Sequence, residues 1–122
     1  MTERHFISLV DDDASLRRSV KNLLNSVGFE VEVFESAEAF MASEFVDQTQ
    51  CLVLDLRLEG MSGLELMAQL AAEARNIPTI MLTAHGEEQV RAKSLALGAI
   101  AFLTKPFRPN ELLDSVNRAL GR

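Results

Sequence analysis

The chain has 122 residues, of which 48% are hydrophobic and 25% are charged, and its formal net charge is −6. We expect one globular domain over residues 1–122, large enough to bury a core without disulfides or structural metal ions. The acidic balance argues against direct nucleic-acid binding by this chain, because a phosphate backbone needs a basic partner face. No apolar run approaches the roughly 20 residues that cross a bilayer, and a signal-peptide core is missing, which predicts a cytoplasmic protein without membrane contact.

The first half of the chain alternates between strand and helix patterns. Residues 6–10 are apolar and predict a buried strand, and apolar residues then recur at helical spacing until Gly28, a typical residue after a helix end. Residues 29–33 alternate apolar and acidic side chains, as in a half-buried strand near a sheet edge. Ser36 suits the N-cap of a short helix that runs to about Ser43.

The third strand and its helix follow the same alternation. Residues 51–54 predict a central strand, and we interpret Cys51 as a small core residue rather than a nucleophile. Ser62 begins a capping-box pattern. The helix behind it has an apolar stripe that we expect to be buried, formed by Leu66, Met67, Leu70 and Ala74. Residues 77–82 predict a fourth strand, with Pro78 at its start, where a missing N–H is tolerated.

The last third of the chain completes five strand–helix units. Residues 87–97 predict a helix ended by Gly98, residues 100–103 predict a strand, and Pro109 suits the first turn of the last helix. Strands that alternate with helices imply parallel strands, right-handed crossovers and helices on both faces of one sheet. We therefore predict an α/β fold, a doubly wound five-stranded parallel sheet with five helices, in the flavodoxin-like strand order 2-1-3-4-5.

Polar side chains follow these strands at their carboxyl ends, where open α/β sheets bind ligands. Asp11, Asp12 and Asp13 follow the first strand, Asp55 the third, Thr83 the fourth and Lys105 the fifth. In the predicted order the first and third strands are neighbours, so Asp11, Asp12 and Asp55 would share one pocket. Carboxylates held so near to one another repel. A divalent cation such as Mg²⁺, or Mn²⁺, would resolve the conflict, because it prefers hard oxygen ligands.

The remaining strand ends suit a phosphorylated ligand. Lys105 offers a compact positive charge for phosphate, and the hydroxyl of Thr83 can donate to another phosphate oxygen. Asp55 is the natural nucleophile, since carboxylates form aspartyl phosphates. Each residue taken singly has a structural alternative, and Asp13 fits the N-cap of the first helix better than a ligand role. The joint pattern at four strand ends favours the functional interpretation.

Four further ionisable residues fit solvent-facing or strand-end roles. Two are acidic and two are histidines: Glu35, Glu59, His5 and His85. The histidines have no His or Cys partner at ligand spacing, so we do not expect them to bind a metal.

The whole chain resembles a CheY-like response-regulator receiver domain, from VDDD near its start to KPF near its end. The stretches LDLRLEGMSGLEL, MLTAHG and GAIAFLTKPF are most similar to the FixJ/NarL-type receivers. The resemblance implies a two-component phosphorelay in which a sensor histidine kinase phosphorylates Asp55 in a Mg²⁺-dependent reaction. Asp12, Asp55 and the backbone carbonyl of Arg57 would ligate Mg²⁺, and Asp11 would act through a metal-bound water. Lys105 would pair with the phosphoryl oxygens.

The resemblance also implies a switch. A cis bond before Pro106 would aim Lys105 into the pocket, Thr83 would move toward the phosphoryl group, and Phe102 would rotate inward behind it. The face built from the fourth helix, fifth strand and fifth helix would then change, and would serve homodimerisation or contact a transcriptional output domain. The chain would be no enzyme beyond catalysing its own phosphorylation and dephosphorylation. The FixJ/NarL-type likeness favours a piece of a longer regulator over a single-domain regulator.

Some residues depart from the receiver pattern. Glu59 stands where many relatives have proline, so we expect a slightly more mobile loop there. Phe102 lacks the hydroxyl of the tyrosine found in many relatives, so packing alone would drive its rotation. Arg57 and His85 flank the site, and we hypothesise that they tune the attack of water on the phosphoryl group and so its lifetime.

Three alternative functions stay open at this point. A haloacid-dehalogenase-type aspartyl-phosphate phosphatase also uses carboxylates, Mg²⁺ and a lysine, and Asp11 with Asp13 fits its Asp-x-Asp pattern, but a cap domain has no place in 122 residues. A receiver fold kept only as a non-phosphorylated interaction module would not need the complete acidic pocket. A flavin carrier would need a phosphate-cradling loop after the first strand, where residues 11–15 are acidic instead.

Overall fold

The sheet has the predicted topology. The computed structural model describes residues 4–84 and 88–122. Its five parallel strands lie in the order β2-β1-β3-β4-β5, which confirms the predicted order. The strands are β1 (Phe6–Val10), β2 (Glu30–Phe34), β3 (Cys51–Asp55), β4 (Thr79–Thr83) and β5 (Ala99–Thr104). The α-helices of the described residues are α1 (Ala14–Ser26), α2 (Ala37–Met41), α3 (Gly63–Ala72), α4 (Arg91–Ala96) and α5 (Pro109–Ala119).

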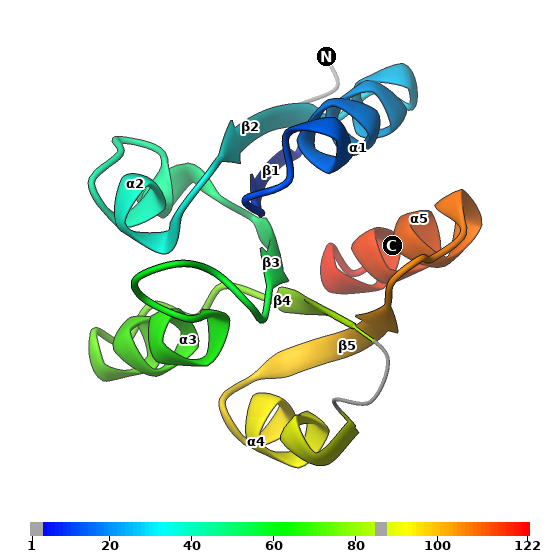
Figure 1. The fold of residues 1–122 in the computed structure, drawn as a ribbon. Coiled ribbons are helices and arrows are strands. Elements are labelled where there is room, and N and C mark those ends of the chain that lie inside the picture. The colour runs from blue at the N-terminus through cyan, green and yellow to red at the C-terminus, as the bar shows by residue number, and fades with distance from the viewer. Residues whose placement is uncertain (1–3, 85–87) are drawn as a thin grey trace.

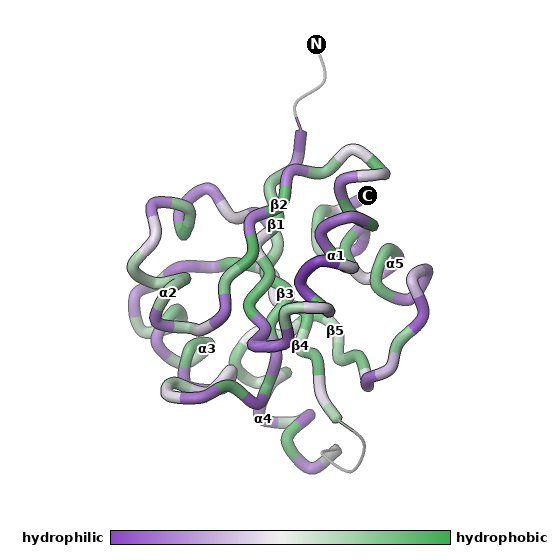
Figure 2. Tube along the Cα trace, turned by 45° about the horizontal axis from the view of Figure 1, so that its top comes forward, coloured by the Kyte–Doolittle hydropathy of each residue, from purple (hydrophilic) through white to green (hydrophobic). Residues whose placement is uncertain are grey.

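The helices cover both faces of the sheet (Figure 1). Helices α1 and α5 lie on one face, and α2, α3 and α4 lie on the other. Each face has its own apolar cluster, because successive strand residues point to opposite sides. Leu24 and Leu112 belong to the first cluster, and Phe40 and Leu66 belong to the second. Figure 2 shows that hydrophobic residues concentrate along the central strands, while hydrophilic residues gather in the connections and on the outer helix faces.

Capping residues begin the helices where the sequence predicts. Asp13 accepts hydrogen bonds from the backbone N–H groups of Ser15 and Leu16 and so caps α1. Ser36 caps α2, and Ser62 forms a complete capping box with Glu65 at α3. These side chains satisfy backbone donors that have no partner inside the helix, so short polar residues determine where α1, α2 and α3 begin.

Several predicted boundaries are wrong by a few residues. Ala74 is exposed, not buried, because α3 ends before it and its backbone takes a left-handed φ of 58°. Helix α2 ends at Met41, before Ser43. Pro78 precedes β4, and its carbonyl accepts from the Leu52 N–H at 2.9 Å. The predicted helix over 87–97 begins, within the described residues, as a 3₁₀ turn over Glu88–Val90.

The apolar core accounts for the cysteine. Cys51 is fully buried in β3, and burial raises the pKa of its thiol to about 12. A thiol with so high a pKa is protonated at neutral pH and is a poor nucleophile, which confirms its interpretation as a core residue. In the part of the chain that the structure describes, no helix is both long and apolar enough to cross a membrane.

Candidate functional site

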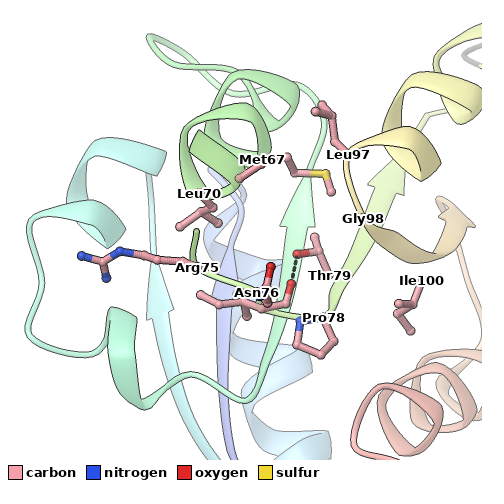
Figure 3. Close-up of a pocket in the computed structure, with 11 residues that line it drawn as sticks. Met67, Leu70, Arg75, Asn76, Pro78, Thr79, Leu97, Gly98 and Ile100 are labelled. Atoms are coloured by element: carbon pink, nitrogen blue, oxygen red, sulfur yellow. Dashed lines mark hydrogen bonds between the residues drawn. The ribbon is translucent and has the colours of Figure 1, made fainter. Parts of the chain in front are cut away.

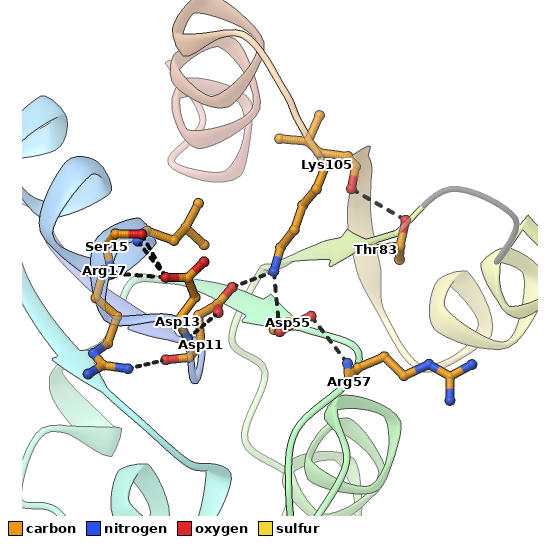
Figure 4. Close-up of polar contacts among 10 residues, drawn as sticks. Asp11, Asp13, Ser15, Arg17, Asp55, Arg57, Thr83 and Lys105 are labelled. Carbon is orange, nitrogen blue, oxygen red and sulfur yellow. Dashed lines mark hydrogen bonds and ion pairs between the residues drawn. The ribbon is translucent and has the colours of Figure 1, made fainter.

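The predicted site residues meet at the carboxyl edge of the sheet (Figure 4). Asp11 directly follows β1, Asp55 ends β3, Thr83 ends β4 and Lys105 directly follows β5. Parallel pairing aligns these strand ends, since Val10 lies opposite Leu54 and Asp55 lies opposite Leu82. Residues 94 positions apart in the sequence therefore touch, as the contact between Lys105 and Asp11 demonstrates.

Lys105 lies between two carboxylates. Its Nζ donates to Asp11 Oδ2 at 2.8 Å and lies 3.3 Å from Asp55 Oδ2. Asp11 is 0% exposed and Asp55 is 5% exposed. The second carboxylate oxygen of Asp11 accepts from the Asp13 N–H at 2.9 Å. Each buried carboxylate thus has a partner, and among the described residues the structure leaves no buried side-chain nitrogen or oxygen without a hydrogen bond.

The acidic cluster has the composition of a site for a hard divalent cation. Asp11, Asp12 and Asp55 each offer a carboxylate oxygen, and these oxygens all lie within 4.8 Å of one another. Asp11 and Asp55 are buried whereas Asp12 is exposed, so the cluster opens to solvent on one side. One lysine cannot neutralise three carboxylates, and oxygen ligands of this kind suit Mg²⁺. The residues present therefore fit the predicted ion.

The charges in this pocket shift two pKa values. Burial, and next the charge of Asp11, raises the pKa of Asp55, although Lys105 and the Arg57 N–H act in the opposite direction. For Lys105, burial acts to lower the pKa, but the hydrogen bond and charge of Asp11, with a contribution from Asp55, outweigh it and raise the pKa. Lys105 stays protonated at neutral pH, while the negative charge on Asp55 is costly in the metal-free protein.

The residues expected to respond to phosphorylation lie around this centre. The Thr83 hydroxyl donates to the Leu103 carbonyl at 3.5 Å. Phe102 packs against the apolar cluster on the α4 face, and the guanidinium of Arg91 lies 5.9 Å from its ring centroid. The peptide bond between Lys105 and Pro106 is cis.

Arg57 and His85 were singled out together from the sequence. The Arg57 N–H donates to Asp55 Oδ1 at 3.2 Å, whereas its guanidinium extends away from that carboxylate (Figure 4). Its backbone, rather than its side-chain charge, therefore faces the pocket. His85 lies outside the described residues.

Three contacts near the site escaped the sequence interpretation. Arg17 on α1 donates from Nη1 to the Asp11 carbonyl oxygen at 2.8 Å. Glu38 on α2 accepts from the Met61 N–H at 2.8 Å. A Cβ on Gly63 would collide with the Asp55 carbonyl oxygen, so glycine allows α3 to start close against β3. Only the spacing of Arg17, in the first turn after the acidic run, offered a sequence signal.

A separate hollow of about 270 Å³ lies at the opposite edge of the sheet, near the starts of β4 and β5 (Figure 3). Apolar side chains dominate its lining, among them Met67 and Leu70. Arg75 at its rim is occupied by ion pairs with Asp47 and Glu73. By contrast, a hollow of about 500 Å³ opens directly beside Asp12, next to the buried carboxylates. The chemistry of the chain therefore gathers at the carboxyl edge.

Comparisons with known proteins agree with this geometry. Residues 7–117 match the family described as the response regulator receiver domain. Nodulation protein W of Bradyrhizobium diazoefficiens is 47% identical over 95% of this chain and 51% of its own length, and the transcriptional regulatory protein TdiR of Thauera aromatica is 42% identical over 93% and 50%. The chain spans about half the length of these relatives.

Solved structures agree as well. The response regulator StyR superposes with a TM-score of 0.91 at 44% identity, over 98% of this chain and 60% of that one. The structure titled FixJ-N gives a TM-score of 0.88 at 34% identity, over 99% and 97%. The chain belongs to the response regulator receiver domain family, and it is a phosphorelay receiver of the two-component type.

Proposed function

We propose that Asp55 is the residue of this receiver that accepts the phosphoryl group. The observation that carries the proposal is a buried carboxylate at a strand end, held beside two further carboxylates and one lysine. A carboxylate oxygen of Asp55 attacks the phosphorus of a phosphohistidine on the partner kinase. The bond between phosphorus and the imidazole nitrogen breaks, the nitrogen keeps the electron pair, and the ring leaves as neutral imidazole once protonated. The product is an acyl phosphate on Asp55.

Receiver domains bind Mg²⁺ at the acidic pocket, and the residues of this chain that we assign to the ion are Asp11, Asp12, Asp55 and the backbone carbonyl of Arg57. The bound ion supplies positive charge that offsets the negative charge of the phosphoryl oxygens. Lys105 provides a second positive charge, since its Nζ lies 3.3 Å from Asp55 Oδ2 and is within reach of a phosphate on that residue. Mn²⁺, which also takes oxygen ligands, would substitute for Mg²⁺.

The output of the reaction is a change in the surface of the domain. Thr83 lies on the strand next to Asp55, so its hydroxyl can leave the Leu103 carbonyl and donate to a phosphoryl oxygen. Phe102, which is only partly buried, then moves into the space behind it, and the surface of α4, β5 and α5 changes. Receivers interact with histidine kinases. We infer that this surface serves homodimerisation or an output domain, which in the matched relatives belongs to transcriptional regulators.

The lifetime of the phosphoryl group depends on the residues that water passes on its way to phosphorus. We assign this tuning to Arg57 and His85, which lie two positions beyond Asp55 and Thr83 in the sequence. The Arg57 guanidinium extends away from the Asp55 carboxylate, so it would act on water that approaches through the hollow beside Asp12, which Arg57 lines. A dephosphorylation rate that stays unchanged in both Arg57→Ala and His85→Ala would exclude this assignment.

The test is intact mass after incubation with Mg²⁺ and acetyl phosphate, and separately with a phosphohistidine donor domain. The parent protein should gain one phosphoryl group, and Asp55→Asn should gain none. Chelation of the ion should abolish the gain, because the charge that it supplies is then missing. A gain that persists in Asp55→Asn would refute the assignment of the acceptor.

The phosphatase alternative is not favoured. It needs Asp13 as a second catalytic carboxylate, but Asp13 Oδ1 accepts from the Ser15 and Leu16 N–H groups as the α1 cap. We propose that this chain catalyses only its own phosphorylation and dephosphorylation, so small phosphate esters should not be turned over.

A further inference from the structure

The loop between β3 and α3 is tied to α2 by one acidic side chain. Glu38 Oε2 accepts a hydrogen bond from the Met61 N–H at 2.8 Å, across 23 positions of sequence. Glu38 itself is exposed, in the first turn of α2. The hydrogen bond from Met61, and next the backbone N–H of Glu38, lowers the pKa of the Glu38 carboxyl. The carboxylate is therefore ionised at neutral pH and accepts the bond in its stronger, charged form.

Gly60 makes room for this contact. Its φ is +76°, which residues with a Cβ rarely adopt, and a Cβ added there would lie 2.5 Å from Glu38 Oε2. The positive φ favours glycine at this position, and a larger residue there would also displace the end of the Glu38 side chain from its present place. Both observations involve the Glu38 carboxylate, which lies over Gly60 and accepts from the N–H of the next residue, Met61.

The tied loop is the one that carries the phosphoacceptor site. It leaves β3 at Asp55, and the Arg57 N–H donates to the Asp55 carboxylate at 3.2 Å. The far end of the loop is held at Gly63, whose N–H donates to the Leu56 carbonyl at 3.1 Å. Glu38 adds a third attachment between these ends, from an element on the same side of the sheet (Figure 1). With Glu59 in place of the proline of many relatives, the sequence predicts a slightly more mobile loop, and the tether supplies a restraint of a different kind.

We propose that Glu38 is a positioning residue for the cation site: its hydrogen bond to Met61 holds the β3–α3 loop so that the Arg57 backbone stays in place beside Asp55. The proposal rests on the proposed function, because it concerns the ion assigned there. Glu38 does not touch the ion, and it acts through the loop backbone. Losing the tether should weaken cation binding without unfolding the domain, since an exposed Glu in a helix tolerates replacement.

Three substitutions separate the hydrogen bond from the charge. Glu38→Gln removes the charge and keeps an acceptor oxygen at the same reach. Glu38→Asp keeps the charge but is one methylene too short for Met61. Glu38→Ala removes both, and alanine preserves the helix. Glu44→Ala is the matched control, because Glu44 is an exposed glutamate that follows the same helix.

Two measurements are made on each variant at fixed ionic strength. Amide hydrogen exchange of the metal-free protein, read by NMR, should be about tenfold faster at Met61 in Glu38→Ala and Glu38→Asp than in the parent. Titration with Mg²⁺ should give a dissociation constant about three- to tenfold higher in those two variants, in the direction seen when residues that orient metal ligands are replaced. Glu38→Gln should stay within about twofold of the parent, as should Glu44→Ala, and urea midpoints should be unchanged.

The outcomes separate cleanly. If Glu38→Asp binds Mg²⁺ like the parent while Glu38→Gln matches Glu38→Ala, charge and not the tether matters, and the proposal is wrong. Unchanged exchange at Met61 in Glu38→Ala would also overturn it. If the parent itself neither binds Mg²⁺ nor becomes phosphorylated, the proposed function fails instead. The amide exchange rate at Met61 in Glu38→Ala would then still show whether Glu38 restrains the loop.

Discussion

Replacing Lys105 by methionine removes the cation between two buried carboxylates and keeps an unbranched side chain. The Lys105 Nζ lies 2.8 Å from Asp11 Oδ2 and 3.3 Å from Asp55 Oδ2. At an effective dielectric constant of about 20, unit charges at such separations attract by about 5–6 kcal/mol before desolvation is subtracted. Breaking a buried ion pair costs about 3–5 kcal/mol. Because 29% of the Lys105 side chain is exposed, we expect the metal-free protein to lose about 2–4 kcal/mol of unfolding free energy.

Urea unfolding in EDTA at pH 7 measures this loss of unfolding free energy. Far-ultraviolet circular dichroism is the suitable probe, because the chain has no tryptophan or tyrosine for fluorescence. The midpoint should fall by about 1–3 M, given m-values of about 1–3 kcal/mol/M. Saturating Mg²⁺ should narrow the difference, since the ion gives the carboxylates a new partner and stabilises the folded state by mass action. Lys93→Met, on the exposed surface of α4, is the control and should stay within about 0.5 kcal/mol of the parent.

A double-mutant cycle tests the cause. Asp55→Asn should stabilise the Lys105→Met protein more than it stabilises the parent, because it removes a carboxylate that has lost its cation, with a coupling of about 1–2 kcal/mol. The reasoning is refuted if Lys105→Met unfolds in EDTA at the same urea concentration as the parent. An equal effect of Asp55→Asn in both backgrounds would refute it as well.

Three further expectations follow from the same structure. Burial and the charge of Asp11 raise the pKa of Asp55, so the contribution of this carboxyl to stability is fully present below its unfolded pKa of about 3.9 and is lost as pH rises through the folded pKa. In urea titrations, the stability of the metal-free parent relative to Asp55→Asn should therefore fall between pH 4 and neutrality. A stability difference that does not change with pH would contradict the pKa shift. Gly63→Ala forces a Cβ against the Asp55 carbonyl oxygen, so it should lower the free energy of unfolding in urea by about 1–3 kcal/mol and slow phosphorylation by acetyl phosphate. An unfolding free energy and a phosphorylation rate equal to those of the parent would mean that the start of α3 shifts without cost to make room for the Cβ. The buried Cys51 thiol, with a pKa of about 12, should resist a disulfide reagent in the native protein and react once in urea, whereas rapid labelling of the folded protein would show that β3 is accessible.

The fold was predictable because its signals are local. Strand and helix periods alternate without interruption, Ser62 and Pro109 sit where helices begin, and Gly28 and Gly98 adopt the positive φ values that end them. Such patterns act within a few residues and need no distant partner. Ala74 shows the limit: its spacing fits the buried stripe of α3, but the helix ends first, and nothing in that short apolar stretch states where.

The candidate site shows the same difference between local and long-range information. The sequence by itself determined which residues stand at the ends of the strands, because each follows an apolar run directly. Only the tertiary structure decided that Asp11 is buried against Lys105 while its neighbour Asp12 is exposed, since adjacent residues turn opposite ways as the chain leaves the sheet. The contact between Glu38 and Met61 likewise joins helix α2 to the β3–α3 loop, and it depends on how α2 and α3 pack on one face of the sheet. Local sequence patterns determine which residues stand at the strand ends. The contacts between them depend on long-range packing, which no short stretch of sequence encodes.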